Sequence, residues 1–495
     1  MSPPSTVPTL RLTTRGYAVS KTGRTTEELQ AVRDALTATP VGADGYAGVG
    51  APTSFAVYHE TPDELFVPRE FGLARFGAPA VCEICDGVAI DHVRFVGELT
   101  DTQTRCADAY MASAAAAHAS SAAQHASSAS TGPPLLRGVV NLPPGAGKTV
   151  ITVSLIARIS RKTLVVVNKD VLMRQWIERL ARFAPAARIG RIQGKTADVV
   201  DRDVVVGMIQ SLSIRDYPPQ TFHGFGFLVV DECHHASAEV FSRCLFKLGF
   251  ARVLGLSATP VRKDGLDSVF RWHAGPVVFE LDRAKDAGVR AVVVSYRNRG
   301  DRAYSELPVL YPSGKPNYSR MINNVCGCAD RTALVVRLVR RVLDLLPPRK
   351  VLVLSDRRAH LDSMRAALNA RDPDVSGVMV GGMSPQDVRT SESRRALLAT
   401  YQYVAEGYDN PELDTLVLAS PKSDVVQVVG RVMRKRPEDR TSGVLIVDVA
   451  DGFGLFSNQS AKRRRFYKDS GFEVSTTSCD AVSATSGDAV FDFIR

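Results

Sequence analysis

From residue 138 onward, short runs of β-branched and other apolar residues alternate with longer stretches of helical spacing. The runs GVVNL, TLVVV, DVVVGM, FGFLVV and ARVLGLS lie between residues 138 and 257. A continuous apolar run of this length is typical of a strand that is buried on both faces. Strands of that kind, separated by helices, predict a parallel sheet with helices on both sides.

A second series of the same kind begins near residue 350 and contains VLVLS, GVMV, LLATY, DTLVLAS and GVLIVDV. A less regular region, residues 283–335, separates the two series. The pattern therefore predicts an α/β protein with two doubly wound parallel-sheet domains in tandem. Ligands of such folds bind at the carboxyl ends of the strands, so we expect a ligand in the cleft between the domains.

The pattern outside the two series gives the remaining organisation. The predicted parts are an N-terminal accessory region (1–94), a first sheet domain (95–282), a connector (283–335), a second sheet domain (336–460) and a basic C-terminal tail (461–495). Residues 111–133 form a low-complexity insertion rich in Ala and Ser. Its Ala-rich beginning extends a helix that starts near Asp101, and its Ser-rich end is typical of a flexible linker.

The composition, with 45% hydrophobic and 23% charged residues, is typical of a soluble globular protein. A net charge of +10 favours a polyanionic partner such as nucleic acid. The eight cysteines are scattered, which indicates a reducing compartment rather than a disulfide framework. No apolar run approaches the ~18 residues of a membrane span, and no secretory segment follows Met1. We therefore expect an intracellular protein without a membrane partner.

A glycine-rich loop lies between the first apolar run and a helical stretch, in NLPPGAGKTVITVSLI. Its residues are Pro144, Gly145, Ala146, Gly147, Lys148 and Thr149. The backbone N–H groups of such a loop wrap phosphate oxygens, the lysine reaches the β- and γ-phosphates, and the hydroxyl is a ligand for Mg²⁺. The strict motif has glycine where this chain has Leu142, so only the G-x-G-K-T part is present.

The run LVVDECHHASAEV, residues 228–240, places five candidate metal ligands in a row after an apolar strand. Zinc takes Cys and His ligands from two separate segments, whereas a hard cation prefers carboxylates and water. A phosphate-binding loop needs an acidic residue at the end of another strand to hold Mg²⁺. We therefore predict that Asp231 holds Mg²⁺ and Glu232 polarises the attacking water, while Cys233 fills space.

Four other features have a structural interpretation, for two of them beside a functional one. Trp176 has leucines four residues to either side, which predicts core packing on a helix. Asp448 ends a buried strand and is interpreted as structural. The run KRRRFYK, residues 462–468, is a solvated helix end, a phosphate contact or a nuclear-import signal. Cys82-x-x-Cys85 is half a zinc knuckle without a clear second pair, so zinc binding there stays open.

The motifs LPPGAGKT, DECH, SATP and QVVGRVMR, in this order, resemble motifs I, II, III and VI of the superfamily 2 helicases. Longer stretches such as KTLVVVNKDVLMRQWIERL and VAEGYDNPELDTLVLASPKSDVVQVVGRVMR are similar to the XPB-like (DECH-box) group. Within that group the chain resembles the helicases of large nucleo-cytoplasmic DNA viruses most. The resemblance covers roughly residues 15–470. It implies two tandem RecA-like domains that bind ATP and Mg²⁺.

The resemblance also implies roles for individual residues of the nucleotide site. The phosphates of ATP would lie on Lys148 and Thr149, and Mg²⁺ would lie on Thr149 and Asp231. Glu232 would be the catalytic base. The residues implied from the second domain are Gln427, Arg431 and Arg434, with Arg434 as the arginine finger. The remaining ones are Gln103 for adenine, Gly407 and Asp409 for the nucleotide, and His234, Ser257 and Thr259 for coupling hydrolysis to domain movement.

Nucleic acid would run across both domains. The implied contacts are Asn168, Lys169, Gly194, Lys195, Gln210, Ser211 and Arg357. Amides and short polar groups of this kind position a strand without reading its sequence. The expected function is an ATP-dependent helicase or translocase that acts on DNA with viral transcription or replication proteins, in the host cytoplasm or nucleus. An RNA helicase, a remodelling ATPase that separates no strands, and a silent structural protein stay open as alternatives.

Overall fold

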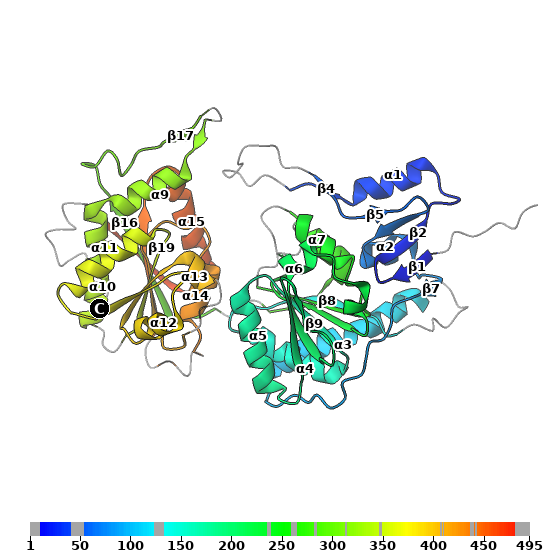
Figure 1. The fold of residues 1–495 in the computed structure, drawn as a ribbon. Coiled ribbons are helices and arrows are strands. Elements are labelled where there is room, and N and C mark those ends of the chain that lie inside the picture. Colours follow the sequence, from blue (N-terminus) through cyan, green and yellow to red (C-terminus); the bar gives the residue numbers. More distant parts are fainter. Residues whose placement is uncertain are drawn as a thin grey trace, which may run out of the picture. The chain divides into compact units, whose positions relative to one another are not determined.

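The computed structural model describes residues 10–40, 54–122, 133–234, 239–258, 265–281, 285–311, 314–345, 349–405, 408, 410–435, 440 and 443–480. The chain divides into two compact units, Met1–Asp282 and Arg283–Arg495. Each unit has a large sheet and a hydrophobic core of its own (Figure 1). Among the described residues, no helix is both long enough and apolar enough to span a membrane.

The first unit is built on an eight-stranded sheet in the order β11-β10-β12-β9-β13-β14-β8-β15. The strands are β8 (Leu136–Asn141), β9 (Thr163–Val167), β10 (Ile189–Gln193), β11 (Thr196–Ala197), β12 (Val204–Met208), β13 (Phe227–Val230), β14 (Arg252–Ser257) and β15 (Val277–Glu280). Neighbouring strands are parallel except for β10 and β11. The five apolar runs of the first series are β8, β9, β12, β13 and β14, which confirms the predicted fold class.

Helices cover this sheet because each presents an apolar face to it. They are α3 (Asp101–Ala122), α4 (Lys148–Ile159), α5 (Asp170–Phe183), α6 (Ile209–Ile214), α7 (Glu239–Leu245) and α8 (Asp267–Ala274), with a 3₁₀ turn at Pro219–Phe222. Helix α5, for example, buries Met173, Trp176 and Leu180, which recur at helical spacing. The Ala-rich beginning of the insertion continues α3 as expected, and residues 123–132 lie outside the described residues.

The N-terminal region forms a smaller sheet in the order β5-β6-β2-β1-β7. Its elements are β1 (Leu10–Thr13), β2 (Gly16–Ser20), α1 (Thr26–Ala35), β5 (His59–Glu60), β6 (Glu64–Val67), α2 (Arg69–Phe76) and β7 (Val81–Cys82), beside a pair β3 (Thr37–Ala38) and β4 (Phe55–Ala56). Buried Arg69 fixes this sheet to the first domain, because its Nη1 donates to the carbonyl oxygens of Phe250 and Ala251, each at 3.2 Å. Asp86 adds an ion pair with Arg252 at 2.5 Å.

The second unit contains a parallel sheet of seven strands in the order β20-β21-β19-β22-β23-β16-β24. Its strands are β16 (Val289–Arg297), β19 (Val351–Ser355), β20 (Ser376–Met379), β21 (Ala396–Thr400), β22 (Thr415–Leu418), β23 (Val444–Asp451) and β24 (Glu473–Asp480). Its helices are α9 (Tyr318–Gly327), α10 (Ala329–Leu345), α11 (Arg358–Asn369), α12 (Pro385–Glu392), α13 (Tyr401–Ala405), α14 (Val426–Val432) and α15 (Gly454–Asp469). A separate pair joins β17 (Val309–Leu310) to β18 (Lys315–Pro316).

The second sheet extends beyond the segment predicted for it. Strand β16 lies between β23 and β24 and is parallel to both. Residues 283–335, expected as a connector, therefore contribute an inner strand, and residues 461–495, expected as a tail, contribute the edge strand β24. The physical reason is that β16 is buried along most of its length, so a strand on each side completes its backbone hydrogen bonds.

Helix α15 carries one arginine of the basic run 462–468 into the interior, together with Tyr467. Arg463 is 2% exposed, and its Nε and Nη2 lie 2.8 Å from the two carboxylate oxygens of Asp448 in β23. The hydroxyl of Tyr467 donates to the same carboxylate at 3.1 Å. Burial alone would lower the pKa of Arg463, but the Asp448 carboxylate outweighs burial and raises that pKa. Asp448 is thus structural, as expected, and Arg463 is its partner rather than a phosphate contact.

Candidate functional site

The sequence-predicted residues of the first unit gather where its parallel strands end, because carboxyl ends of parallel strands lie at one edge of a sheet. The phosphate loop follows β8, Asp231 follows β13 and Ser257 ends β14, and these strands are neighbours. Asn168 follows β9, Gly194 follows β10 and Gln210 lies just after β12, and these strands are also neighbours. The strand order therefore separates two groups of residues along one edge.

The phosphate loop has the backbone geometry that phosphate binding needs. Gly145 and Gly147 have φ angles of 88° and 85°, which residues with a Cβ rarely adopt. A Cβ on Gly145 would meet nothing within 4 Å, so the loop is open on that side. Helix α4 begins at Lys148, directly after the loop, with Thr149 as its second residue. The N–H groups of its first turn are therefore available to an anion.

Gln103 of α3 lies against this loop, although the Ala- and Ser-rich insertion separates the two in the sequence. Its Nε2 donates to the carbonyl oxygen of Ala146 at 3.2 Å, and its Oε1 accepts from the N–H of Thr100 at 3.0 Å. A Cβ on Gly147 would collide with the same Gln103 side chain. The residue predicted for adenine and the loop predicted for phosphates are thus in contact.

Asp231 and Glu232 form a charged cluster with the lysine of the loop. Lys148 Nζ lies 3.2 Å from Glu232 Oε1, and both side chains are largely buried. Glu232 has a φ of 47°, and such left-handed residues often occur at functional positions. Its N–H donates to Asp231 Oδ1 at 3.0 Å. The ammonium group and the carboxylate predicted to act on water therefore meet directly.

Burial, and then repulsion from Glu232, raise the pKa of Asp231 above its ordinary value. The charge of Lys148 and a hydrogen bond from Trp176 oppose that rise. Burial also raises the pKa of the Cys233 thiol, which is packed in the core of the first unit. Cys233 is therefore a protonated, space-filling residue beside the two carboxylates.

Ser257 and His234 connect the carboxylates to the neighbouring strand β14. Ser257 Oγ lies 3.4 Å from His234 Nδ1, and the same ring nitrogen lies 3.5 Å from Glu232 Oε2. Two of the three residues predicted to couple hydrolysis to movement are therefore beside the carboxylate that is predicted to be the catalytic base. The third, Thr259, lies outside the described residues.

Trp176 of α5 takes part in the site, which its sequence pattern did not predict. The expected core packing is confirmed, since Trp176 is 2% exposed and lies in the core of the first unit. Its indole Nε1 also donates to Asp231 Oδ2 at 2.8 Å. The one available signal was chemical: a buried indole N–H usually finds an acceptor, but the sequence does not say which.

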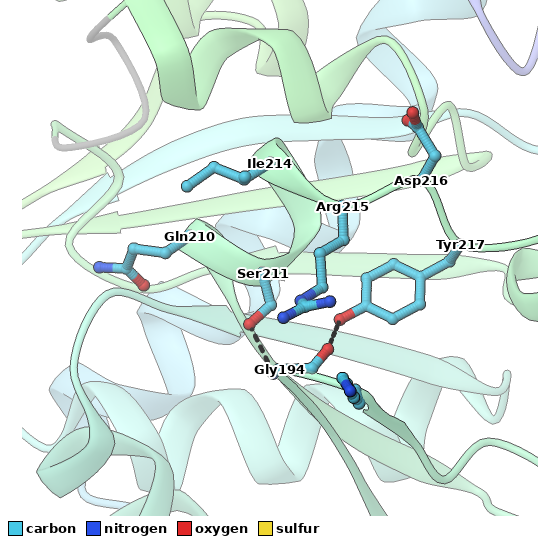
Figure 2. A pocket seen from close by; sticks show the side chains of 8 residues that line it. Gly194, Gln210, Ser211, Ile214, Arg215, Asp216 and Tyr217 are labelled. Carbon is cyan, nitrogen blue, oxygen red and sulfur yellow. Dashed lines mark hydrogen bonds between the residues drawn. The ribbon is translucent and has the colours of Figure 1, made fainter.

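The second group of residues lines an open pocket of about 790 Å³ (Figure 2). Its lining residues are Gly194, Lys195, Gln210, Ser211, Ile214, Arg215, Asp216 and Tyr217. Gly194 is held from two sides, because its N–H donates to Ser211 Oγ at 2.9 Å and its carbonyl accepts from the Tyr217 hydroxyl at 2.7 Å. Four of the implied nucleic-acid contacts thus share one pocket. Tyr217, which no motif indicated, fixes its backbone.

The remaining two contacts implied for the first unit are neighbours of this pocket. The carbonyl oxygen of Asn168 accepts from Gln210 Nε2 at 2.7 Å, which ties the end of β9 to the beginning of α6. Lys169 is the N-cap residue of α5. The structure therefore brings the loops after β9, β10 and β12 together.

In the second unit, Gln427 and Arg431 lie one turn apart on α14 and share a face of that helix. Both side chains are half-buried, as is Arg434 shortly after the helix ends. The helix packs through Val428, Val429 and Val432, which are buried. The polar face and the arginine that follows are thus held by the core of the second sheet.

The other residues predicted in the second unit gain no support from the structure as nucleic-acid or nucleotide contacts. Arg357 is engaged within the chain, since its Nε donates to Asn323 Oδ1 at 2.5 Å and its Nη2 to Ser319 Oγ at 3.1 Å. The guanidinium group of Arg357 is therefore hydrogen-bonded within the chain rather than presented to nucleic acid. Gly407 and Asp409 lie outside the described residues.

The described part of the chain holds no group of three or more His, Cys, Asp and Glu side chains suited to a metal ion. Cys85 Sγ lies 4.0 Å from the carbonyl oxygen of Phe225, to which it donates. The donors at the sheet edge fit a hard cation instead, because Asp231 offers a carboxylate and Thr149 a hydroxyl. The open side of the loop at Gly145 leaves room for the phosphate oxygens that would complete a Mg²⁺ coordination sphere.

A phosphate loop at a helix N-terminus, a neighbouring pair of acidic residues, and two parallel sheets in tandem define the class of the RecA-like nucleotide-hydrolysing motors. Within this chain, residues 98–262 match the family model of the Type III restriction enzyme, res subunit. The match contains the phosphate loop, the acidic pair and Ser257.

Several viral proteins are similar to the chain. It is 26% identical over 472 residues to the "Putative ATP-dependent RNA helicase L396" of Acanthamoeba polyphaga mimivirus, covering 94% of this chain and 86% of that protein. It is 27% identical over 365 residues to the "Putative ATP-dependent RNA helicase QP509L" of African swine fever virus, covering 69% and 70%. It is 27% identical over 344 residues to the "Putative helicase 055L" of Frog virus 3, covering 69% and 75%.

Solved structures share the fold. S. cerevisiae Dbp5 bound to RNA and ADP BeF3 has a TM-score of 0.52 at 14% identity, covering 80% of this chain and 93% of that chain. A fragment described as a "putative HsdR subunit of a type I restriction enzyme" from Vibrio vulnificus YJ016 has a TM-score of 0.50 at 18% identity, covering 70% and 65%. Over 69–94% of its length the chain is thus similar to putative helicases of large nucleo-cytoplasmic DNA viruses, two of which carry names that describe ATP-dependent enzymes.

Proposed function

We propose that this helicase uses ATP to translocate along DNA and to separate its strands, and that it serves transcription or replication of a large DNA virus inside the infected cell. The observation that carries the proposal is the arrangement along one sheet edge. The Lys148–Glu232 contact of 3.2 Å joins the segments that follow β8 and β13, and the pocket around Gly194 lies beside β10 and β12. Nucleotide chemistry and a strand-binding surface therefore share one rigid sheet.

In the proposed reaction, the loop N–H groups and Lys148 bind the β- and γ-phosphates of ATP. The arrival of ATP exchanges the contact between Lys148 and Glu232 for one between Lys148 and phosphate. That exchange releases the Glu232 carboxylate to orient the attacking water and accept its proton. Asp231 and Thr149 would hold Mg²⁺, which when bound would neutralise the charge that develops on the phosphates.

The second unit supplies the groups that complete hydrolysis. Gln427 positions water or senses the γ-phosphate, and Arg431 and Arg434 carry positive charge to the transition state. An arginine finger contributes about 10³- to 10⁵-fold in rate, so hydrolysis requires the two units to close on ATP. A difference in strand affinity between closed and open states converts that cycle into steps along the strand.

The strand-binding chemistry explains why a motor of this kind needs no sequence specificity. The side chains and amides around Gly194, Ser211 and Gln210 suit phosphate and sugar oxygens, which every sequence presents. The resemblance to XPB-like helicases favours double-stranded DNA as the substrate, and the net charge of +10 is consistent with a nucleic-acid partner.

RNA is the second candidate substrate. Two of the relatives carry names that describe ATP-dependent RNA helicases. Phosphate contacts are common to both nucleic acids, so the pocket chemistry alone does not select between them. A remodelling ATPase that moves along DNA without separating strands is a variant of the main proposal.

The test is ATP turnover with single-stranded DNA, duplex DNA or RNA present. Lys148→Ala is expected to lower turnover about 100-fold or more, because it removes a preorganised positive charge from the phosphates. Lys468→Ala, in an exposed position on α15, is the matched control and should leave turnover unchanged. We expect DNA to stimulate the wild type more than RNA does.

Three outcomes decide among the candidates. Stronger stimulation by RNA would favour the RNA helicase. Stimulation by DNA without strand displacement on any overhang would favour the remodelling ATPase. A wild-type protein that hydrolyses no ATP with any of the nucleic acids would contradict the proposal as a whole.

A further inference from the structure

The structure assigns Trp176 as a positioning residue of the ATPase site, which holds the Asp231 carboxylate in the orientation that binds Mg²⁺. This inference rests on the proposed function, because it gives Asp231 the metal. It begins from the contact between the indole Nε1 and Asp231 Oδ2, which are 2.8 Å apart.

The indole N–H of Trp176 donates its hydrogen bond to Asp231. Tryptophan is a donor only, and a buried donor without an acceptor is costly. Trp176 is 2% exposed and lies among apolar neighbours of the core that include Met173, Leu180 and Val206. In that surrounding, the carboxylate of Asp231 is the acceptor that satisfies the N–H.

The same contact restricts the carboxylate. Asp231 Oδ2 accepts from the indole, and Asp231 Oδ1 accepts from the N–H of Glu232 at 3.0 Å. With one donor on each oxygen, rotation of the carboxylate plane would break at least one hydrogen bond. Each oxygen still has a second lone pair, which is available to a cation or its water. The arrangement is the one expected for an outer partner of a metal ligand.

The two donors that hold Asp231 come from different elements. The Glu232 N–H belongs to the loop after β13, at a residue with a φ of 47°. The indole belongs to α5, a helix of 14 residues that packs into the core through three buried side chains. Trp176 therefore connects the proposed metal ligand to a helix that is anchored in the core.

Trp176→Phe keeps the aromatic packing and removes the N–H. Loss of an outer partner typically costs 10- to 100-fold in metal affinity or activity, so the Mg²⁺ concentration for half-maximal ATP turnover is expected to rise about ten-fold. The chain has one other tryptophan, Trp272 in α8, whose ring packs against Phe71 with centroids 6.2 Å apart. Trp272→Phe is the matched control and should leave the Mg²⁺ dependence unchanged.

The Trp272→Phe protein also gives a readout that does not depend on turnover, because Trp176 is then its only indole. Adding Mg²⁺ to this protein with saturating ADP is expected to change the tryptophan emission, since the cation and the indole share one carboxylate. The measurement needs no substitution at Trp176, so it stands even if Trp176→Phe fails to fold.

The outcomes separate this inference from the proposed function. A wild-type Mg²⁺ curve for Trp176→Phe, or a Trp176 emission that does not respond to Mg²⁺ with ADP, would show that the indole only packs. A wild-type protein without ATP turnover would contradict the proposed function, and the emission measurement would still decide the role of Trp176.

Discussion

Replacing Arg463 with Met tests whether the basic run at residues 462–468 acts inside the protein. The substitution keeps a long apolar side chain and removes the guanidinium. It leaves the Asp448 carboxylate, whose residue is fully buried, with the Tyr467 hydroxyl but without the two 2.8 Å contacts to Arg463. Breaking a buried ion pair by removing one partner costs about 3–5 kcal/mol, because the remaining charge has lost its compensation.

That cost is large enough to measure as a melting temperature. For a body of about 150–250 residues, 1 kcal/mol shifts the midpoint by roughly 2–4 °C, so the second unit should melt about 6–20 °C lower. Thermal unfolding followed by circular dichroism measures the shift. Arg464→Met is the matched control, since Arg464 is the exposed neighbour and its loss should stay within about 0.5 kcal/mol.

The same substitution should lower ATP turnover at temperatures where the protein stays folded. The Arg463 Nη1 donates to the carbonyl oxygen of Lys422 at 2.5 Å, in the segment that precedes α14 with Gln427 and Arg431. Equal melting temperatures for Arg463→Met and Arg464→Met would refute the interior role. A double variant, Arg463→Met with Asp448→Leu, should recover much of the lost stability, because it removes the uncompensated charge as well.

Three further predictions each concern a single residue. Gly147→Ala should weaken ADP binding about ten-fold or more, measured by calorimetry, because a φ of 85° strains an alanine and its Cβ would displace the Gln103 side chain from the phosphate loop; Gly382→Ala, with a φ of 90° and nothing within 4 Å of its Cβ, is the control. Tyr217→Phe removes the hydroxyl that holds the Gly194 carbonyl, so fluorescence anisotropy should show about five-fold weaker oligonucleotide binding, and turnover without nucleic acid should not change. Burial, and then the charge of a neighbouring arginine, lower the pKa of His360 to about 3. The unfolded chain therefore binds a proton at His360 below pH ~6.5, whereas the folded chain binds it only near pH 3. Between these two pH values, His360 lowers the free energy of unfolding by about 1.4 kcal/mol for each pH unit that the pH falls. Urea unfolding at pH 7 and pH 5 should show a smaller difference for His360→Gln, and an unchanged difference would contradict the assignment.

The sequence predicts those parts of the molecule whose structure depends on residues close together in the chain. Strands buried on both faces need continuous apolar residues, and the phosphate loop and acidic pair act through neighbours in the chain. Strand β16 was missed as a sheet member because its partners β23 and β24 lie more than a hundred residues away. The role of Arg463 could not be predicted for a related reason. A basic residue is usually exposed, and the burial of Arg463 depends on Asp448 in a different element.

Helix α5 physically connects the two groups of residues at the sheet edge. It begins at Asp170, directly after Asn168 and Lys169, and Trp176 contacts Asp231 less than two turns later. A helix packed into a core moves as a stiff body, so a displacement of its first turn by a bound strand also displaces the indole. The route from the loop proposed to bind a strand to the carboxylate proposed to bind Mg²⁺ is thus a few residues of one helix and one hydrogen bond. If nucleic acid stimulates ATP turnover, as proposed, this helix offers a physical route for the effect within the first unit.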